Sequence, residues 1–174
     1  MKLYFDEIDT PVGPMTLLGH DDKLIRMDFG SMNELSEYYH KWMTRYLSCT
    51  ELIHYPDAKV FLQAKSELKN YFDRKQSTFS IDLEFHGTPF QRMVWRSLYD
   101  IIPFGETRSY KDIAIAIGNP KAVRAVGGAV NKNPFSIIVP CHRVIGTNGK
   151  MVGYNGGLDK KEFLLKHENI IVSF

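Results

Sequence analysis

The sequence predicts two domains, a mixed α/β domain over residues 1–85 followed by a mainly helical domain over residues 86–174. Strand-like and helix-like patterns alternate in the first part, whereas the second is a series of helix signals separated by glycine and proline. The two parts also differ in charge: residues 1–85 hold 10 basic and 14 acidic side chains, and residues 86–174 hold 12 and 6. A chain of 174 residues is long enough to bury two such cores.

The first domain is expected to begin with a hairpin. Apolar runs at Met15–Leu18 and Leu24–Phe29 flank a polar turn at His20–Asp22. Ser31 and Glu34 then form a capping-box pattern that begins a helix. Apolar residues recur at helical spacing after it: Met32, Leu35, Tyr39, Trp42, Met43 and Tyr46. A further helix near residues 57–74 and a strand over residues 79–85 complete the predicted domain.

The second domain begins with a clear helix signal. Thr88 is the expected N-cap, Pro89 suits the first helical position, and Gln91 completes the capping box. Its expected buried stripe consists of Phe90, Val94, Leu98 and Ile101.

Two short helices are expected next. Ser109 caps the first, over residues 110–117, which Gly118 closes, and the second runs from Asn119-Pro120 to about Asn131. Two short helices joined by a tight turn predict a helix-turn-helix.

The second of these helices has an unusual composition. Gly127 and Gly128 lie in its interior, where each costs about 1 kcal/mol relative to alanine. Close helix packing explains one glycine. A helix that presses its backbone against a ligand explains the run of small residues together with the single protruding Arg124. The basic charge of this domain suits a polyanion such as nucleic acid, although a chance imbalance on a solvated surface is the alternative.

A candidate nucleophile follows an apolar run. Residues 136–140 predict a short buried strand, and Cys141, His142 and Arg143 come directly after it. A thiol attacks carbon as the thiolate, and we expect His142 to lower the pKa of Cys141. Adjacent residues on an extended segment face opposite ways, so this contact requires a tight turn or a bridging water. The alternative is that Cys141 is a small buried apolar residue.

The C-terminal segment predicts a turn at residues 147–149, a flexible loop at residues 153–157 and a last helix capped by Asp159 and Glu162. Glu168 lies on the apolar face of this helix. It is either an ordinary surface carboxylate or a buried one that needs a partner, for which His142 is the candidate.

The segment Pro140–Val144 resembles the active-site signature of the O6-alkylguanine-DNA alkyltransferases. The similarity extends in order over nearly all of residues 88–168, including the motifs at residues 102–107, 122–127 and 153–158. Residues before this part match loosely, chiefly at Thr10–Pro14.

The resemblance implies a ribonuclease-H-like α/β domain over residues 1–85 and a helical DNA-binding and alkyl-acceptor domain over residues 86–174. It implies that the second helix of the helix-turn-helix enters the minor groove, where Arg124 fills the gap left by a flipped nucleotide. The implied DNA-binding residues are Lys121, Arg124, Ala125, Gly127 and Gly128.

The resemblance also implies roles in the reaction. Cys141 is the nucleophile, His142 the base that reaches it through a water, and Glu168 the carboxylate that orients His142. Asn133 is the hinge between the recognition helix and the active-site segment, and Tyr110 donates to N3 of the flipped guanine. The implied substrate-pocket residues are Val144, Tyr154 and Asn155, of which Asn155 departs from the small residue common in the family. Arg143 is expected to form a structural ion pair.

The implied activity is direct, irreversible and stoichiometric transfer of an alkyl group from O6-alkylguanine, with O4-alkylthymine as a further candidate, in double-stranded DNA. We expect no cofactor, no metal site, no membrane contact, a monomer and a cytoplasmic location, since two distant cysteines and a polar N-terminus indicate neither disulfides nor secretion. The main rival is a non-enzymatic sensor of alkylated DNA, which lacks the reactive cysteine. A transcription regulator and a cysteine hydrolase fit the residues less well.

Overall fold

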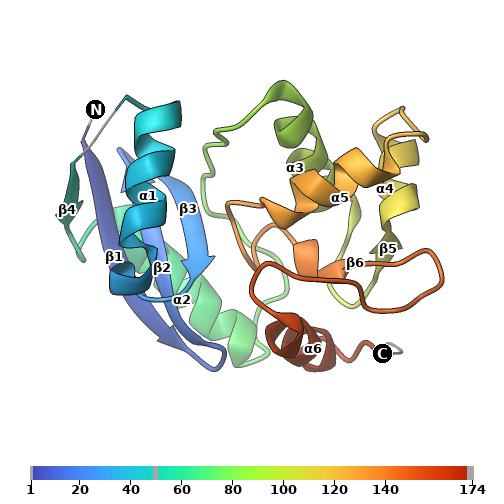
Figure 1. Cartoon of the computed structure of the whole chain (residues 1–174). Coiled ribbons are helices and arrows are strands. Elements are labelled where there is room, and N and C mark those ends of the chain that lie inside the picture. The colour runs from blue at the N-terminus through green and yellow to red at the C-terminus, as the bar shows by residue number, and fades with distance from the viewer. Residues whose placement is uncertain (1, 49–50, 172–174) are drawn as a thin grey trace. The chain divides into compact units, whose positions relative to one another are not determined.

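The computed structural model describes residues 2–48 and 51–171, so Cys49 lies outside the described part. The chain divides into two compact units, Met1–His86 and Gly87–Phe174. In the described ranges, every helix is too short or too polar to cross a lipid bilayer. The predicted fold class, an α/β unit followed by a mainly helical unit, is confirmed (Figure 1).

The first unit contains a four-stranded sheet with two helices. Its elements are β1 (Leu3–Thr10), β2 (Gly13–His20), β3 (Lys23–Phe29), α1 (Met32–Tyr46), β4 (Leu52–His54) and α2 (Lys59–Phe72). The strand order is β3-β2-β1-β4, with β4 parallel to β1 and the other pairs antiparallel. The predicted hairpin is β2 and β3, which turn through Asp21 at a φ of 51°. Both predicted helices are present, and α1 begins with the predicted capping box.

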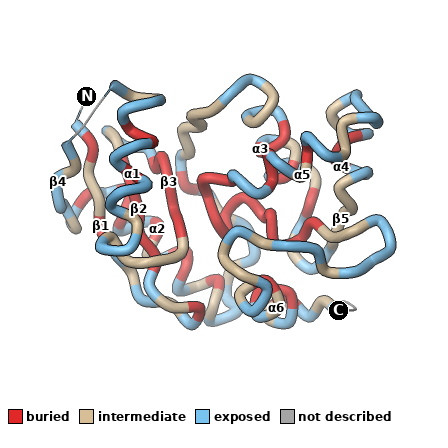
Figure 2. The backbone as a smooth tube through the Cα atoms, in the orientation of Figure 1, coloured by how far each residue is buried: buried red, intermediate tan, exposed pale blue. Residues whose placement is uncertain are grey.

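The core of this unit lies on the sheet. Tyr39, Trp42 and Met43 of α1 pack against the strand residues Leu3, Leu18 and Ile25. On β2, every residue from Met15 to Gly19 is buried, so neither face of this strand is open to solvent (Figure 2).

The second unit is built from short helices and one small parallel strand pair. Its elements are α3 (Pro89–Ile101), β5 (Arg108–Ser109), α4 (Tyr110–Ala116), α5 (Val123–Asn131), the 3-10 turn η1 (Cys141–Arg143), β6 (Val144–Ile145) and α6 (Leu158–His167). The predicted caps at Thr88 and Ser109 are present, each as a reciprocal capping box. Gly118 closes the turn after α4 at a φ of +79°, so the predicted helix-turn-helix is α4 and α5.

Four predictions about the extent, caps or buried stripes of elements need correction. Residues 79–85 form only a single bridge from Leu83 to Leu24, because no further hydrogen bonds extend that pairing. Helix α5 begins at Val123, later than predicted, after a turn at Pro120. The last helix begins at Leu158, so Asp159 lies inside its first turn and does not cap it. The buried stripe of α3 consists of Val94, Trp95 and Leu98. The predicted stripe residues Phe90 and Ile101 are only partly buried.

The apolar segment before the cysteine is buried as predicted but is not a strand. Its residues form consecutive turns, with Ile137 at a φ of 74° and hydrogen bonds from Val139 N to Phe135 O and from Cys141 N to Val139 O. Strands β1 and β4 were not predicted, because acidic residues interrupt the apolar pattern of β1 and β4 has only three residues.

Candidate active site

Cys141 begins the 3-10 turn η1 and is buried in the second unit. The side-chain amide of Asn133 donates to Cys141 Sγ at 3.0 Å and to the carbonyl of Val139 at 2.8 Å. Its carbonyl oxygen accepts from the backbone N–H of Phe135 at 3.0 Å. Asn133, just after α5, therefore replaces the missing strand hydrogen bonds and joins this helix to the segment that carries the thiol.

The environment of Cys141 both opposes and favours the thiolate. Burial raises the pKa of the thiol, because an ion is poorly solvated there. The hydrogen bond from Asn133, the nearby phenol of Tyr154 and the positive charge of Lys161 lower the pKa, but only in part. The expected effect of His142 on the thiol pKa stays a prediction. Cys141 and His142 lie in a 3-10 turn, but Nδ1 of His142 does not bond to the thiol, so of the two expected routes only a bridging water could link them.

His142 and Glu168 form a buried pair. Nε2 of His142 lies 2.6 Å from Glu168 Oε2, and both side chains are completely inaccessible to solvent. Burial would raise the pKa of Glu168, but hydrogen bonds and charge from His142 and Arg143 hold it well below its usual value. Burial lowers the pKa of His142 despite the carboxylate. A neutral ring beside an ionised carboxylate donates through Nε2–H, which makes Nδ1 the basic nitrogen.

Nδ1 of His142 has no hydrogen-bond partner among the described protein atoms, although it is buried. Such an atom is available to accept a proton. Arg143 completes the cluster as the predicted ion pair, with Nε 2.7 Å from Glu168 Oε1 and Nη1 donating to the carbonyl of Ile102 at 2.8 Å. The backbone N–H of Gly105 also donates to Glu168 Oε1, at 3.3 Å.

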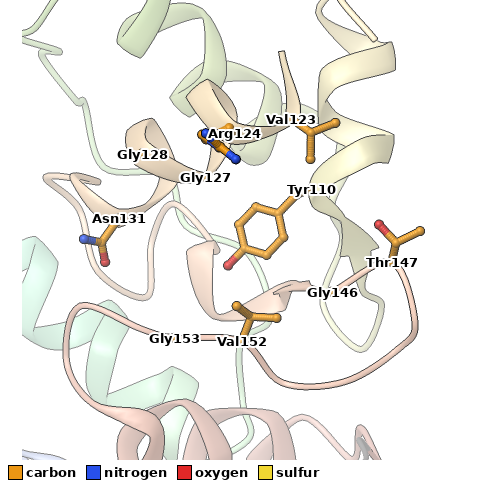
Figure 3. A pocket seen from close by; sticks show the side chains of 10 residues that line it. All are labelled: Tyr110, Val123, Arg124, Gly127, Gly128, Asn131, Gly146, Thr147, Val152 and Gly153. Carbon is orange, nitrogen blue, oxygen red and sulfur yellow. The ribbon is translucent and has the colours of Figure 1, made fainter. Parts of the chain in front are cut away.

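The second unit also contains a cavity of about 770 Å³ (Figure 3), which Cys141, His142 and Glu168 do not line. Its walls are Tyr110, Val123, Arg124, Gly127, Gly128, Asn131, Gly146, Thr147, Val152 and Gly153. Four of the residues implied by the family resemblance are therefore brought together: Tyr110, Arg124, Gly127 and Gly128. The implied pocket residues Val144, Tyr154 and Asn155 do not line it; Val144 is buried and Asn155 is exposed.

The sequence did not predict the part of the cavity wall formed by Gly146, Thr147, Val152 and Gly153. Strands β5 and β6 pair in parallel, with Ser109 opposite Ile145. Tyr110 and Gly146 follow these two partners, so the pairing sets the loop after β6 beside the tyrosine ring. A turn signal at Thr147 was visible in the sequence, but the parallel pair of two-residue strands that positions it was not.

Tyr110 begins α4 and its ring lies between the α5 wall and Val152 (Figure 3). Burial, together with the negative charge of a nearby Cys141 thiolate, raises the pKa of Tyr110. The phenol therefore stays protonated at neutral pH and can donate a proton into the cavity.

The glycines of α5 are not required by packing within the protein. A Cβ at Gly128 would meet no atom within 4 Å, and one at Gly127 would touch only the Tyr110 ring at 3.8 Å, an ordinary contact. Close helix packing therefore does not explain them. The exposed face of this segment consists of Lys121, Arg124, Ala125 and Gly128.

Known proteins match both units. The family described as "6-O-methylguanine DNA methyltransferase, DNA binding domain" matches residues 89–170, and the one described as "6-O-methylguanine DNA methyltransferase, ribonuclease-like domain" matches residues 3–85. The chain belongs to the O6-methylguanine-DNA methyltransferase family.

Individual relatives of this methyltransferase family are similar over nearly the whole chain. The methylated-DNA–protein-cysteine methyltransferase of Methanosarcina barkeri is 45% identical, covering 95% of this chain and 97% of that protein. The crystal structure of the Mycobacterium tuberculosis O6-methylguanine methyltransferase is 42% identical, with a TM-score of 0.80, covering 95% of this chain and 92% of that one. A crystal structure of the same M. tuberculosis protein in complex with DNA is equally similar, at 42% identity and a TM-score of 0.80.

For this methyltransferase-family chain, the predicted absence of a metal site stays a prediction. Over residues 2–48 and 51–171, no three His, Cys, Asp or Glu side chains are grouped so that they could hold a metal ion.

Proposed function

We propose that this chain repairs DNA by moving the alkyl group of O6-alkylguanine to Cys141. The observation that supports it best is the buried thiol of Cys141, joined to α5 through Asn133, together with the protonated phenol of Tyr110, which lines the cavity and lies near enough for the thiolate charge to raise its pKa. The membership of both units in the methyltransferase family agrees with it.

In the proposed reaction, the thiol proton passes to Nδ1 of His142 through a bridging water, and Glu168 holds the ring that receives it. The thiolate attacks the alkyl carbon, so that an S–C bond forms and the C–O6 bond of guanine breaks. The departing guanine takes a proton at N3 from Tyr110. Asn133 donates a hydrogen bond to the thiolate before attack, and the nearby phenol of Tyr154 also favours the thiolate. This displacement requires no cofactor.

The partner in this proposal is double-stranded DNA carrying an alkylated guanine, bound by residues 86–174 as a DNA-binding and alkyl-acceptor domain. Residues 1–85 form the ribonuclease-H-like domain. The exposed face with Lys121, Ala125 and Gly128 approaches the minor groove, and Arg124 takes the place of the flipped nucleotide. Val144, Tyr154 and Asn155 are the proposed alkyl-pocket residues; they do not line the cavity described above, so in this proposal they would act on the alkyl group only once the flipped base is bound. The protein acts as a monomer in the cytoplasm.

A titration tests this proposal. The protein is incubated with excess duplex containing O6-methylguanine, and its peptides are mapped by mass. One methyl group per molecule, on Cys141 and not on Cys49, is expected, because a thioether has no leaving group that water can displace. The Cys141→Ser variant is the control and should take up none.

Two outcomes would contradict the proposal. Several lesions repaired per molecule, or label released into water, would show a turnover catalyst. Binding to methylated duplex without any transfer would show a non-enzymatic sensor.

A further inference from the structure

Lys161 is a buried cation that the proposed reaction does not use. It lies on α6 and is completely inaccessible to solvent. Its ammonium group donates to the carbonyl of Val144 at 2.7 Å and to that of Val152 at 3.0 Å. Both partners are neutral, and in the part of the chain that the structure describes no carboxylate pairs with Lys161. Burying an ammonium ion without an anion is costly, so this arrangement needs a reason.

Its two partners belong to different parts of the site. Val152 lines the cavity, whereas Val144 follows the turn that carries the nucleophile. Residues 146–151 form a loop between these two partners. Its backbone hydrogen bonds are local ones, from Gly146 N to Lys150 O and from Gly149 N to Gly146 O. The ammonium group of Lys161 adds a further link, from Val152 of the returning half to Val144 of β6.

Lys161 also acts on the nucleophile. Burial lowers the pKa of Lys161 to about 8, and the charge of a Cys141 thiolate raises it. In return, the charge of Lys161 lowers the pKa of Cys141. The other groups around the ammonium are His142, whose pKa its charge also lowers, and the Tyr154 ring, whose centre lies 5.9 Å from Nζ.

Building on the proposed alkyl transfer, we propose that Lys161 is a positioning residue whose ammonium group fastens the cavity wall at Val152 to Val144 and presents its charge to the Cys141 thiolate. One side chain thus couples the shape of the substrate cavity to the formation of the nucleophile. The arrangement suits a site that must be closed around a flipped base when its thiolate forms.

The test compares Lys161→Met with Lys166→Met, an exposed lysine on the same helix. Hydrogen exchange of the amides of residues 146–153 should be about tenfold faster in Lys161→Met, because two charge-assisted hydrogen bonds are lost. The pH profile of Cys141 alkylation by iodoacetamide, followed by peptide mapping, should move up by about one pH unit. Lys161→Arg should restore the pH profile at least in part, and Lys166→Met should match the parent in both measurements.

A folded Lys161→Met protein whose thiol profile overlays that of the parent overturns the proposal, even if its loop exchanges faster, because a merely structural lysine would change the loop alone. If the Lys161→Met variant does not fold, the proposal is tested on the parent protein by the pH dependence of its hydrogen exchange. Its loop protection, corrected for intrinsic exchange, should fall as the pH rises through about 8, where Lys161 loses its proton. Constant protection from about pH 7 to 9 would equally overturn it. Neither readout uses DNA, so a failure of the proposed DNA repair is recognised separately by the methylation titration.

Discussion

Replacing Gly128 with alanine should make the protein more stable and a poorer repair protein. Gly128 lies within α5 on its exposed face, and the added Cβ would meet no atom within 4 Å. The change therefore introduces no strain, while alanine has the higher helix propensity and restricts the unfolded chain. The expected gain is about 1 kcal/mol in the free energy of unfolding. For a unit of this size, that corresponds to about 4–8 °C in Tm.

On duplex DNA the same methyl group should be harmful. In the proposed complex the backbone at Gly128 approaches the minor groove, where one additional carbon shifts the helix outward. A displacement of this size is expected to slow transfer by about 10- to 100-fold. The reaction with free O6-methylguanine base should change little, because the base alone does not need this surface.

The assay combines thermal unfolding with single-turnover repair of a methylated duplex and of the free base. Gly127→Ala is the matched comparison: its Cβ would lie 3.8 Å from the Tyr110 ring, inside the cavity wall, so both substrates should react more slowly. A Gly128→Ala protein that repairs the duplex at the parent rate would refute the interpretation of this glycine as a DNA-contact surface.

Three further predictions concern single side chains. Arg124→Ala should slow repair of duplex DNA strongly and reaction with the free base only slightly; equal losses on both would exclude a role in holding the flipped nucleotide. Tyr110→Phe should keep the fold but lose about 10²–10⁴ in transfer rate, and a Phe variant at full rate would remove this phenol from the mechanism. Glu168→Gln should move the pH profile of Cys141 reactivity upward, because His142 becomes a weaker base, and an unchanged profile would count against the relay. Glu168 has a lowered pKa in the folded protein, so its contribution to stability is present above about pH 4.5 and is lost as the pH falls. The free energy of unfolding of the parent should therefore decrease in acid, and that of the Glu168→Gln variant should decrease less.

The sequence by itself determined most helices and singled out Cys141 as the proposed reacting group. The capping boxes at Ser31, Thr88 and Ser109 are local patterns, since a cap bonds to backbone only three residues away, and all three are present. The glycine pair in α5 was also visible, because an unfavourable residue inside a helix is conspicuous in the sequence alone.

Tertiary structure decided how the site is closed. The run before Cys141 satisfies the burial pattern of a strand, but the side chain of Asn133 provides its hydrogen bonds and it forms turns instead. Lys161 looks like any helical surface lysine in the sequence, yet it is buried under two carbonyl groups. The parallel pairing of β5 with β6 likewise sets Gly146 beside Tyr110. Each of these depends on contacts between segments distant in the chain, and burial and hydrogen-bond partners of that kind are set by packing, which no local pattern of residues encodes.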